Sequence, residues 1–125
     1  MISINARPLL PGEGRGQAIV VDALSFYGEV DPRTGRLVDG RSIADRVLII
    51  KRPRGSTVGS YTIYGLKYYG KKPLAIIVET TADPILVAGA VLAEIPLFDN
   101  AKGILDYVSD GDMVEFNRNG EIIIK

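Results

Sequence analysis

The sequence predicts a single α/β domain over residues 1–125, an open sheet or partial barrel with helices packed on it. Asp45–Lys51 and Leu74–Thr80 are short, continuous apolar runs, as in strands buried on both faces. Each run precedes a stretch with helical spacing or a helix-start signal, and β-type segments flank this middle part. Strands alternating with helices in this way are typical of one mixed α/β fold.

The composition supports one folded domain. At 125 residues and 46% hydrophobic content, the chain can bury a core and is not disordered. Fifteen basic and fifteen acidic residues give no net charge, so the composition indicates no nucleic-acid or membrane partner. We find no secretion signal and no apolar run of membrane-spanning length, and we therefore expect a soluble, cytoplasmic protein.

The chain contains no cysteine and no histidine. This excludes disulfides, thiol catalysis, a Ser-His-Asp triad, and zinc or thiolate-cluster sites built on those residues. The carboxylates are scattered, so we predict no metal site in this chain. Any catalysis must use hydroxyl, amine, guanidinium or carboxylate groups, or groups of another chain.

The first strand is predicted over Gly16–Leu24, which is rich in β-branched residues. Residues 25–40 follow as a long connection with turn signals at Asp31-Pro32 and Thr34-Gly35. Its polar side chains either line a site or belong to a hairpin-like loop anchored by an aromatic residue. The polar residues concerned are Ser25, Tyr27, Glu29 and Asp31.

Two helices are predicted after the buried strands. The first begins near Ser60 and ends at Gly70, before Pro73. Its tyrosines, at positions 61, 64, 68 and 69, are expected at the core and rim rather than as a base-stacking platform. The second helix begins with Asp83 as N-cap and Pro84 at the first helical position. This helix is apolar nearly all round, which predicts burial.

The C-terminal part is predicted to be mainly β-structure. Residues 96–100 resemble a strand and residues 101–108 a short helix. A hairpin follows over residues 110–125, for which Asn119-Gly120 predicts a tight primed turn.

The segment KRPRGSTVGSY, Lys51–Tyr61, connects a predicted strand to a predicted helix. Glycine and serine at such a junction let backbone N–H groups point at an anion. The segment lacks the Gly-Lys-Ser/Thr ending of a P-loop. It is either an anion cradle or an ordinary capped turn with Ser60 as helix N-cap. The candidate cradle residues are Arg54, Gly55, Ser56, Thr57, Gly59 and Ser60.

Three segments together resemble the small, swivelling subunit of the aconitase X family: LSFYGEVDPRTGRLVD, KRPRGSTVGSYTIYGL and TADPILVAGAVLAEIP. The resemblance covers nearly the whole chain. It implies a swivelling β/β/α domain that closes over a large partner subunit, whose own cysteines hold an iron–sulfur cluster. No cofactor is then expected in this chain. One departure is Glu29, where glycine is more usual, and it places a carboxylate at the rim of the site.

The resemblance also implies an activity and a base. The reaction is loss of water from (R)-5-phosphomevalonate, giving trans-anhydromevalonate 5-phosphate in the archaeal mevalonate pathway to isoprenoids. Ser56, directly after Gly55, matches the serine that such dehydratases present as the proton-removing base. Arg54 and the N–H groups at the following helix start are suited to stabilising its alkoxide. Thr57, Gly59 and Ser60 are candidates for support or substrate binding.

Two other functions are compatible with the sequence. The chain could serve a related dehydratase that acts on another hydroxy acid, such as a hydroxyproline. It could also be a non-catalytic module whose Gly-Ser loop holds a phosphate. A swivelling phosphocarrier domain is excluded, because such a carrier needs a histidine.

Overall fold

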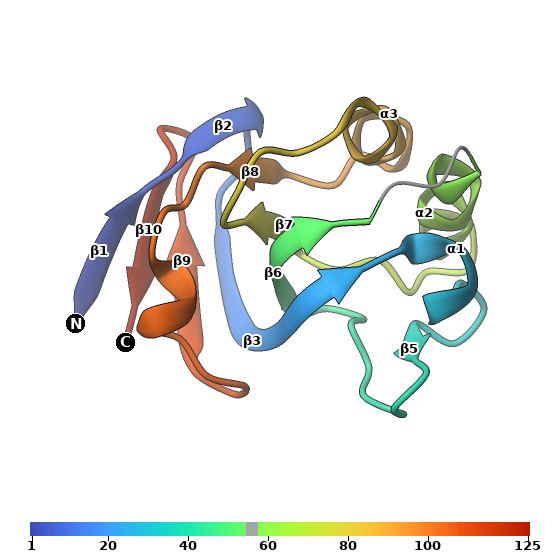
Figure 1. Cartoon of the computed structure of the whole chain (residues 1–125), viewed down its shortest axis with the longest axis horizontal. Coiled ribbons are helices and arrows are strands. Elements are labelled where there is room, and N and C mark those ends of the chain that lie inside the picture. The colour runs from blue at the N-terminus through green and yellow to red at the C-terminus, as the bar shows by residue number, and fades with distance from the viewer. Residues whose placement is uncertain (55–57) are drawn as a thin grey trace.

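The computed structural model describes residues 1–54 and 58–125, which form three layers (Figure 1). An antiparallel sheet and a mostly parallel central sheet pack together, and helices cover the far side of the central sheet. The strands are β1 (Ile2–Asn5), β2 (Arg7–Leu10), β3 (Gly14–Leu24), β4 (Val30–Asp31), β5 (Arg36–Leu37), β6 (Val47–Pro53), β7 (Ala75–Val78), β8 (Leu97–Asp99), β9 (Met113–Phe116) and β10 (Glu121–Ile124). The helices are α1 (Phe26–Glu29), α2 (Gly59–Tyr68), α3 (Pro84–Ala93) and the 3₁₀ helix η1 (Ile104–Asp106).

The main sheet has the strand order β1-β10-β9-β3-β6-β7-β8-β2. β3 belongs to both layers, since its first residues pair antiparallel with β9 and its later residues pair parallel with β6. β1 and β2 follow one another in the chain but pair with β10 and β8, so the N-terminal segment links the two ends of the order. The β/β/α arrangement with a partial barrel is therefore confirmed.

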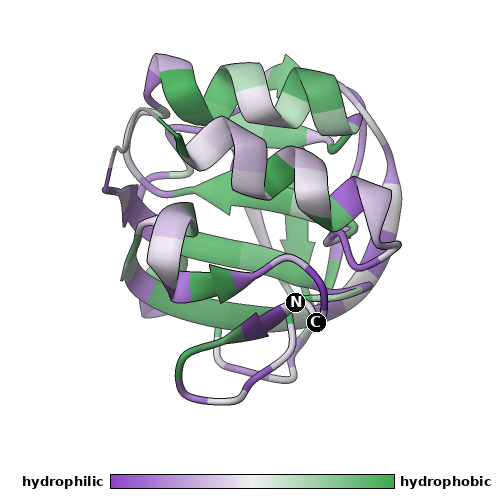
Figure 2. Ribbon diagram, turned by 90° about the vertical axis from the view of Figure 1, so that its right-hand side faces the viewer, coloured by the Kyte–Doolittle hydropathy of each residue, from purple (hydrophilic) through white to green (hydrophobic). Residues whose placement is uncertain are grey.

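The alternation of side chains along β6 divides the core in two. Val47 and Ile49 face the antiparallel sheet, whereas Leu48 and Ile50 face the helices. All four are fully buried. Figure 2 shows that the central strands are hydrophobic along their length, as expected for a sheet covered on both faces.

Both long helices lie where the sequence predicted them, and they pack against each other closely. A Cβ built at Gly89 of α3 would lie 2.6 Å from Cδ1 of Ile63 and 3.2 Å from Cα of Ser60. A larger residue at position 89 would therefore push the Ile63 side chain and the start of α2 away from α3.

The expectation that the α2 tyrosines reach the core was wrong. Tyr61 and Tyr68 are 75% and 74% exposed, and Tyr64 and Tyr69 are also exposed. The buried face of α2, toward the sheet, instead carries aliphatic side chains such as Ile63. The close contact with α3 on that face leaves the bulkier rings on the outside.

The predicted burial of α3 on all sides was also wrong. Val91 and Leu92 are 54% and 57% exposed, because α2 and the sheet cover only the inner side of this helix. α3 has 10 residues.

No helix in the described ranges 1–54 and 58–125 is long and apolar enough to cross a membrane.

The C-terminal hairpin is present, but its turn differs from the prediction. Gly120 N–H donates to the Asn117 carbonyl at 3.0 Å, and Gly120 alone in this turn has a positive φ, of 89°. A two-residue primed turn would require positive φ at Asn119 as well. The connection is therefore a three-residue loop with glycine in the left-handed position.

Candidate functional site

The parallel strands β3, β6 and β7 end at one edge of the central sheet. Leu24 pairs in register with Pro53, and Ile50 pairs with Val78. β6 leads toward α2 and β7 toward α3, so both helices begin at this edge (Figure 1). Ligands of open α/β sheets commonly bind outside the carboxyl ends of the strands. This edge is therefore the candidate site.

A small pocket lies at this edge. It has an apolar lining from the strand ends and the two helices, with Arg54 and Asp83 as its charged members. The lining residues are Leu24, Phe26, Pro53, Arg54, Gly59, Ile63, Asp83, Ile85 and Leu86. The structure thus brings the loop after β3, the end of β6 and the starts of α2 and α3 together.

Three of the predicted site residues are placed at this edge. Arg54 directly follows β6, and its N–H donates to the Leu24 carbonyl at 2.8 Å. Gly59 is the first residue of α2 and is buried against α3. Ser60 follows within the helix. Gly55, Ser56 and Thr57 lie outside the described residues.

Of the two alternatives for this segment, the one with Ser60 as N-cap of α2 is wrong. The helix begins one residue earlier, so the N-cap position falls to Val58, whose side chain makes no capping hydrogen bond. Tyr61 N–H donates to the Val58 carbonyl at 3.1 Å. The positive end of the α2 dipole, with no cap from Val58, favours an anion nearby.

The start of α3 differs, and here the sequence prediction is confirmed. An Asp83 side-chain oxygen accepts from the N–H of Leu86 at 2.8 Å, and Pro84 occupies the first turn. Asp83 therefore acts as a structural cap, although it also lines the pocket.

The loop after β3 contributes a carboxylate that pairs with Arg54. The Glu29 carboxylate accepts from the N–H of Ser25 at 2.6 Å and from the Arg54 guanidinium. The Ser25 N–H has the largest effect on the pKa of Glu29 and lowers it. Slight burial raises that pKa, but Arg54 lowers it further, so the carboxyl is charged at neutral pH.

The other polar residues of this loop have separate roles. Tyr27 is exposed, and Asp31 accepts from the N–H of Arg33 at 2.9 Å, which stabilises the turn of the β4–β5 hairpin. The buried ring of Phe26 anchors the loop. The sequence left open whether these residues line a site or belong to a hairpin-like loop anchored by an aromatic residue. Asp31 belongs to such a loop, whereas Glu29 pairs with Arg54 at the candidate site.

Sequence reasoning missed an ion pair behind the site, between a buried aspartate and a half-exposed arginine. Asp99 is fully buried and accepts two hydrogen bonds from Arg7, each at 2.8 Å, and one from the N–H of Ala82 at 2.9 Å. Burial raises the pKa of Asp99, but the bonds from Arg7 and Ala82 outweigh it and bring the pKa below its usual value. The sequence signal that could have indicated this pair was an aspartate at the end of an apolar strand.

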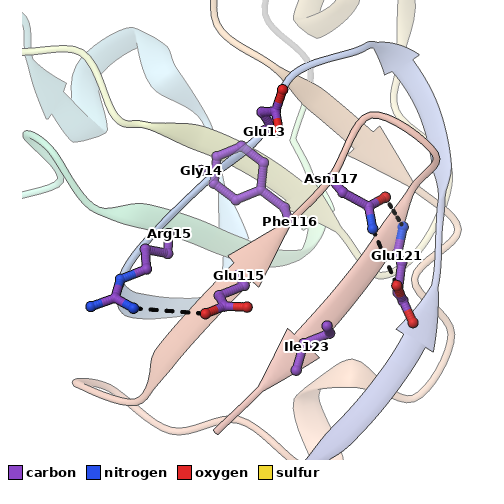
Figure 3. Close-up of a pocket in the computed structure, with 8 residues that line it drawn as sticks. All are labelled: Glu13, Gly14, Arg15, Glu115, Phe116, Asn117, Glu121 and Ile123. Carbon is purple, nitrogen blue, oxygen red and sulfur yellow. Dashed lines mark hydrogen bonds and ion pairs between the residues drawn. The ribbon is translucent and has the colours of Figure 1, made fainter.

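A second hollow, of about 370 Å³, lies on the antiparallel sheet away from this edge (Figure 3). Four of its polar side chains form two pairs: Arg15 lies 3.8 Å from Glu115, and Asn117 donates to Glu121 at 3.1 Å. The hollow shares no lining residue with the pocket at the strand ends. We therefore place the candidate site at the strand ends.

The donor set of this chain does not fit an iron–sulfur cluster, because none of its 125 residues is a cysteine or histidine. Within residues 1–54 and 58–125, no group of three acidic side chains is arranged to hold a metal ion. The residues at the strand ends instead offer a guanidinium and a helix start, which suit an anion.

Comparison with known proteins identifies the family. The model of the aconitase X swivel domain matches residues 3–124. The chain belongs to this family. The resemblance in the three sequence segments is thereby confirmed. The crystal structure of Thermococcus kodakaraensis aconitase X (holo-form) matches with a TM-score of 0.91 at 36% identity. That match covers 100% of this chain and 99% of the other.

Relatives of this aconitase X swivel domain carry a functional name. The phosphomevalonate dehydratase small subunit of Aeropyrum pernix is 50% identical over 121 residues, which cover 96% of this chain and 91% of that protein. The protein of the same name from Methanosarcina acetivorans is 40% identical over 124 residues, covering 93% and 85%.

Proposed function

We propose that this chain is the small subunit of a hydro-lyase that dehydrates (R)-5-phosphomevalonate to trans-anhydromevalonate 5-phosphate in the archaeal mevalonate pathway. The observation that carries the proposal is 50% identity, over 96% of the chain, to a phosphomevalonate dehydratase small subunit. The anion-favouring edge of the sheet agrees with a phosphorylated carboxylic acid as substrate.

Ser56 is the proposed base. Its alkoxide takes a proton from the carbon beside the substrate carboxylate, and the C–H electron pair forms the double bond. The hydroxyl on the neighbouring carbon leaves with the electrons of its C–O bond, and with a proton it becomes water. The new double bond is the one that trans-anhydromevalonate 5-phosphate contains.

The neighbours of Ser56 supply the stabilisation that a serine alkoxide needs. Arg54 at the end of β6 provides positive charge, and α2, which begins at Gly59, directs its positive dipole end toward the same edge. We assign Gly55, Thr57 and Ser60 to support of the base or to substrate binding. Charge-assisted contacts of this kind lower the pKa of a hydroxyl.

A large partner subunit completes the proposed enzyme. An iron–sulfur cluster would need thiolate ligands, and this chain has none, so the cluster belongs to the partner. We therefore expect the isolated chain to be colourless and inactive. Anaerobic treatment with iron and sulfide is expected to leave it so.

The proposal is tested by anaerobic affinity purification with the tagged chain from its source organism. Mass spectrometry identifies the captured protein, and a visible spectrum reports any cluster. We expect a brown, cysteine-containing large subunit. A capture under cluster-preserving conditions that contains no iron–sulfur protein would favour a phosphate-binding module instead.

A further inference from the structure

We infer that Glu29 is a positioning residue: it holds the Arg54 guanidinium at the carboxyl end of β6, where Arg54 receives an anionic group of the substrate. The inference rests on the proposed function and adds a residue to that site. Arg54 is the group that contacts the substrate, and Glu29 acts through it.

The backbone before Glu29 is shaped to bring its carboxylate back toward the strand end. Phe26 is buried and fixes the start of the turn, and Gly28 reverses the chain with a φ of 85°. A residue with a side chain rarely adopts this angle. The Glu29 carboxylate then accepts from the N–H of Ser25 at 2.6 Å, so backbone on its own turn fixes its position.

Arg54 is held at both ends. Its backbone N–H donates to the Leu24 carbonyl at 2.8 Å, and its guanidinium donates to the Glu29 carboxylate. The Glu29 side chain is 30% exposed, whereas the Arg54 side chain is 56% exposed. The carboxylate is thus the fixed member of the pair, and the guanidinium keeps an accessible side.

A guanidinium has five N–H donors in a planar fork, and the bond to Glu29 that the structure records uses one nitrogen. Other donors can therefore bind a phosphate or carboxylate in two-pronged fashion while Glu29 keeps its contact. Without Glu29, the long side chain must be ordered each time substrate binds, and this weakens binding. The negative charge of Glu29 has the opposite effect, because it repels an anionic substrate. Whether removal of that charge raises or lowers KM is therefore a test.

Steady-state kinetics of the complete heteromer measure this effect. Glu29→Gln keeps an acceptor for the Ser25 N–H but removes the charge that orients Arg54. We expect it to raise the KM for (R)-5-phosphomevalonate about five-fold, the size of one exposed ion pair, with kcat within about two-fold. An unchanged or lowered KM would overturn the inference, since a lowered value means that Glu29 competes with the substrate.

A double-mutant cycle separates positioning from loop structure. Arg54→Gln alone is expected to raise KM more than Glu29→Gln does, and adding Glu29→Gln to it should change KM no further. The same rise in both backgrounds would show that Glu29 acts on the loop and not through Arg54. Glu94→Gln removes a comparable Lys–Glu pair at the far ends of α2 and α3, and its KM should match wild type.

A second measurement requires no turnover. In the isolated full chain, nuclear magnetic resonance of the arginine side chains should show slow rotation of the Arg54 guanidinium, which Glu29→Gln accelerates. Equal rotation in both chains would refute the positioning role. Failure of the proposed function is distinguished by Ser56→Ala: if that heteromer keeps its turnover, the base assignment fails, while the restraint of Arg54 is still decided by the rotation rates.

Discussion

The starts of α2 and α3 lie at the same edge of the sheet but are built differently. α3 follows β7, and its first turn has both a capping Asp83 and Pro84. α2 follows β6, and its N-cap residue is Val58, which has no polar side chain to offer. Arg54 lies just before the start of α2, and Asp99 lies behind the start of α3.

The difference separates a structural junction at α3 from the proposed catalytic junction at α2. At α3, the carboxylates of Asp83 and of the buried Asp99 accept from backbone N–H groups, as stability requires. At α2, the cap position contributes no side-chain oxygen and a cation lies close by. A helix start of that kind can act on a substrate anion rather than on its own carboxylate.

Ser56→Ala should have the largest effect, because it removes the proposed base. We expect kcat of the heteromer to fall about 10³-fold, within the range for loss of a general base. Complex formation, measured by gel filtration, should be unchanged. Ser60→Ala is the matched control in the first turn of α2 and should reduce kcat far less. Equal losses for the two serines would contradict the assignment.

Asp99→Ala should have the second-largest effect, because it destabilises the junction between β7 and α3. It leaves Arg7 and the N–H of Ala82 without their partner, and we expect a loss of about 2–4 kcal/mol in the free energy of unfolding at pH 7. Because the folded-state pKa of Asp99 is lowered, this stability is present above the unfolded value of about 3.9 and is lost as pH falls through the folded pKa.

Urea unfolding of wild type and Asp99→Ala at several pH values measures this difference. The two curves should converge as the pH drops below about 4. Asp22→Ala, at an exposed position of β3, is the control and should stay within about 0.5 kcal/mol of wild type. A stability difference that does not depend on pH would show that the Asp99 charge is unimportant.

Val58→Asp would convert the α2 start into the α3 type. We expect about 0.5–1 kcal/mol of added stability from the new cap. The same carboxylate should repel the substrate anion and raise KM about ten-fold, which corresponds to about 1.4 kcal/mol. Val58→Asn supplies a neutral cap, so it should stabilise the chain and affect KM less. Equal KM values for the two variants would argue against an anion at this position.

Asp83→Ala should have the smallest effect. It removes one cap from α3, and we expect a loss of about 1 kcal/mol in thermal or chemical unfolding. Asp83→Asn keeps a side-chain oxygen for the N–H of Leu86 and should lie close to wild type. If alanine and asparagine destabilise equally, the cap contributes nothing.

Local patterns predicted much of the fold. The apolar runs gave β6 and β7, and Asp83-Pro84 gave the start of α3, because these features depend on neighbouring residues alone. The cap of α2 was misjudged by two residues, since Val58 and not Ser60 occupies the N-cap position. Such boundaries depend on how the helix meets α3, and local spacing does not contain that contact.

The charged contacts around the site were not predictable in the same way. Glu29 and Arg54 are 25 positions apart, and Arg7 and Asp99 are 92 apart. Only the fold brings each pair together. The sequence did place Arg54 and Gly59 near one junction, and family resemblance rather than local pattern singled out Ser56.

The most direct test of the account is a mixing experiment. The isolated chain and its large subunit, each purified anaerobically, are assayed separately and together for conversion of (R)-5-phosphomevalonate to trans-anhydromevalonate 5-phosphate. We expect product only from the mixture. Full activity of the large subunit alone, or an inert mixture with an intact cluster, would contradict it.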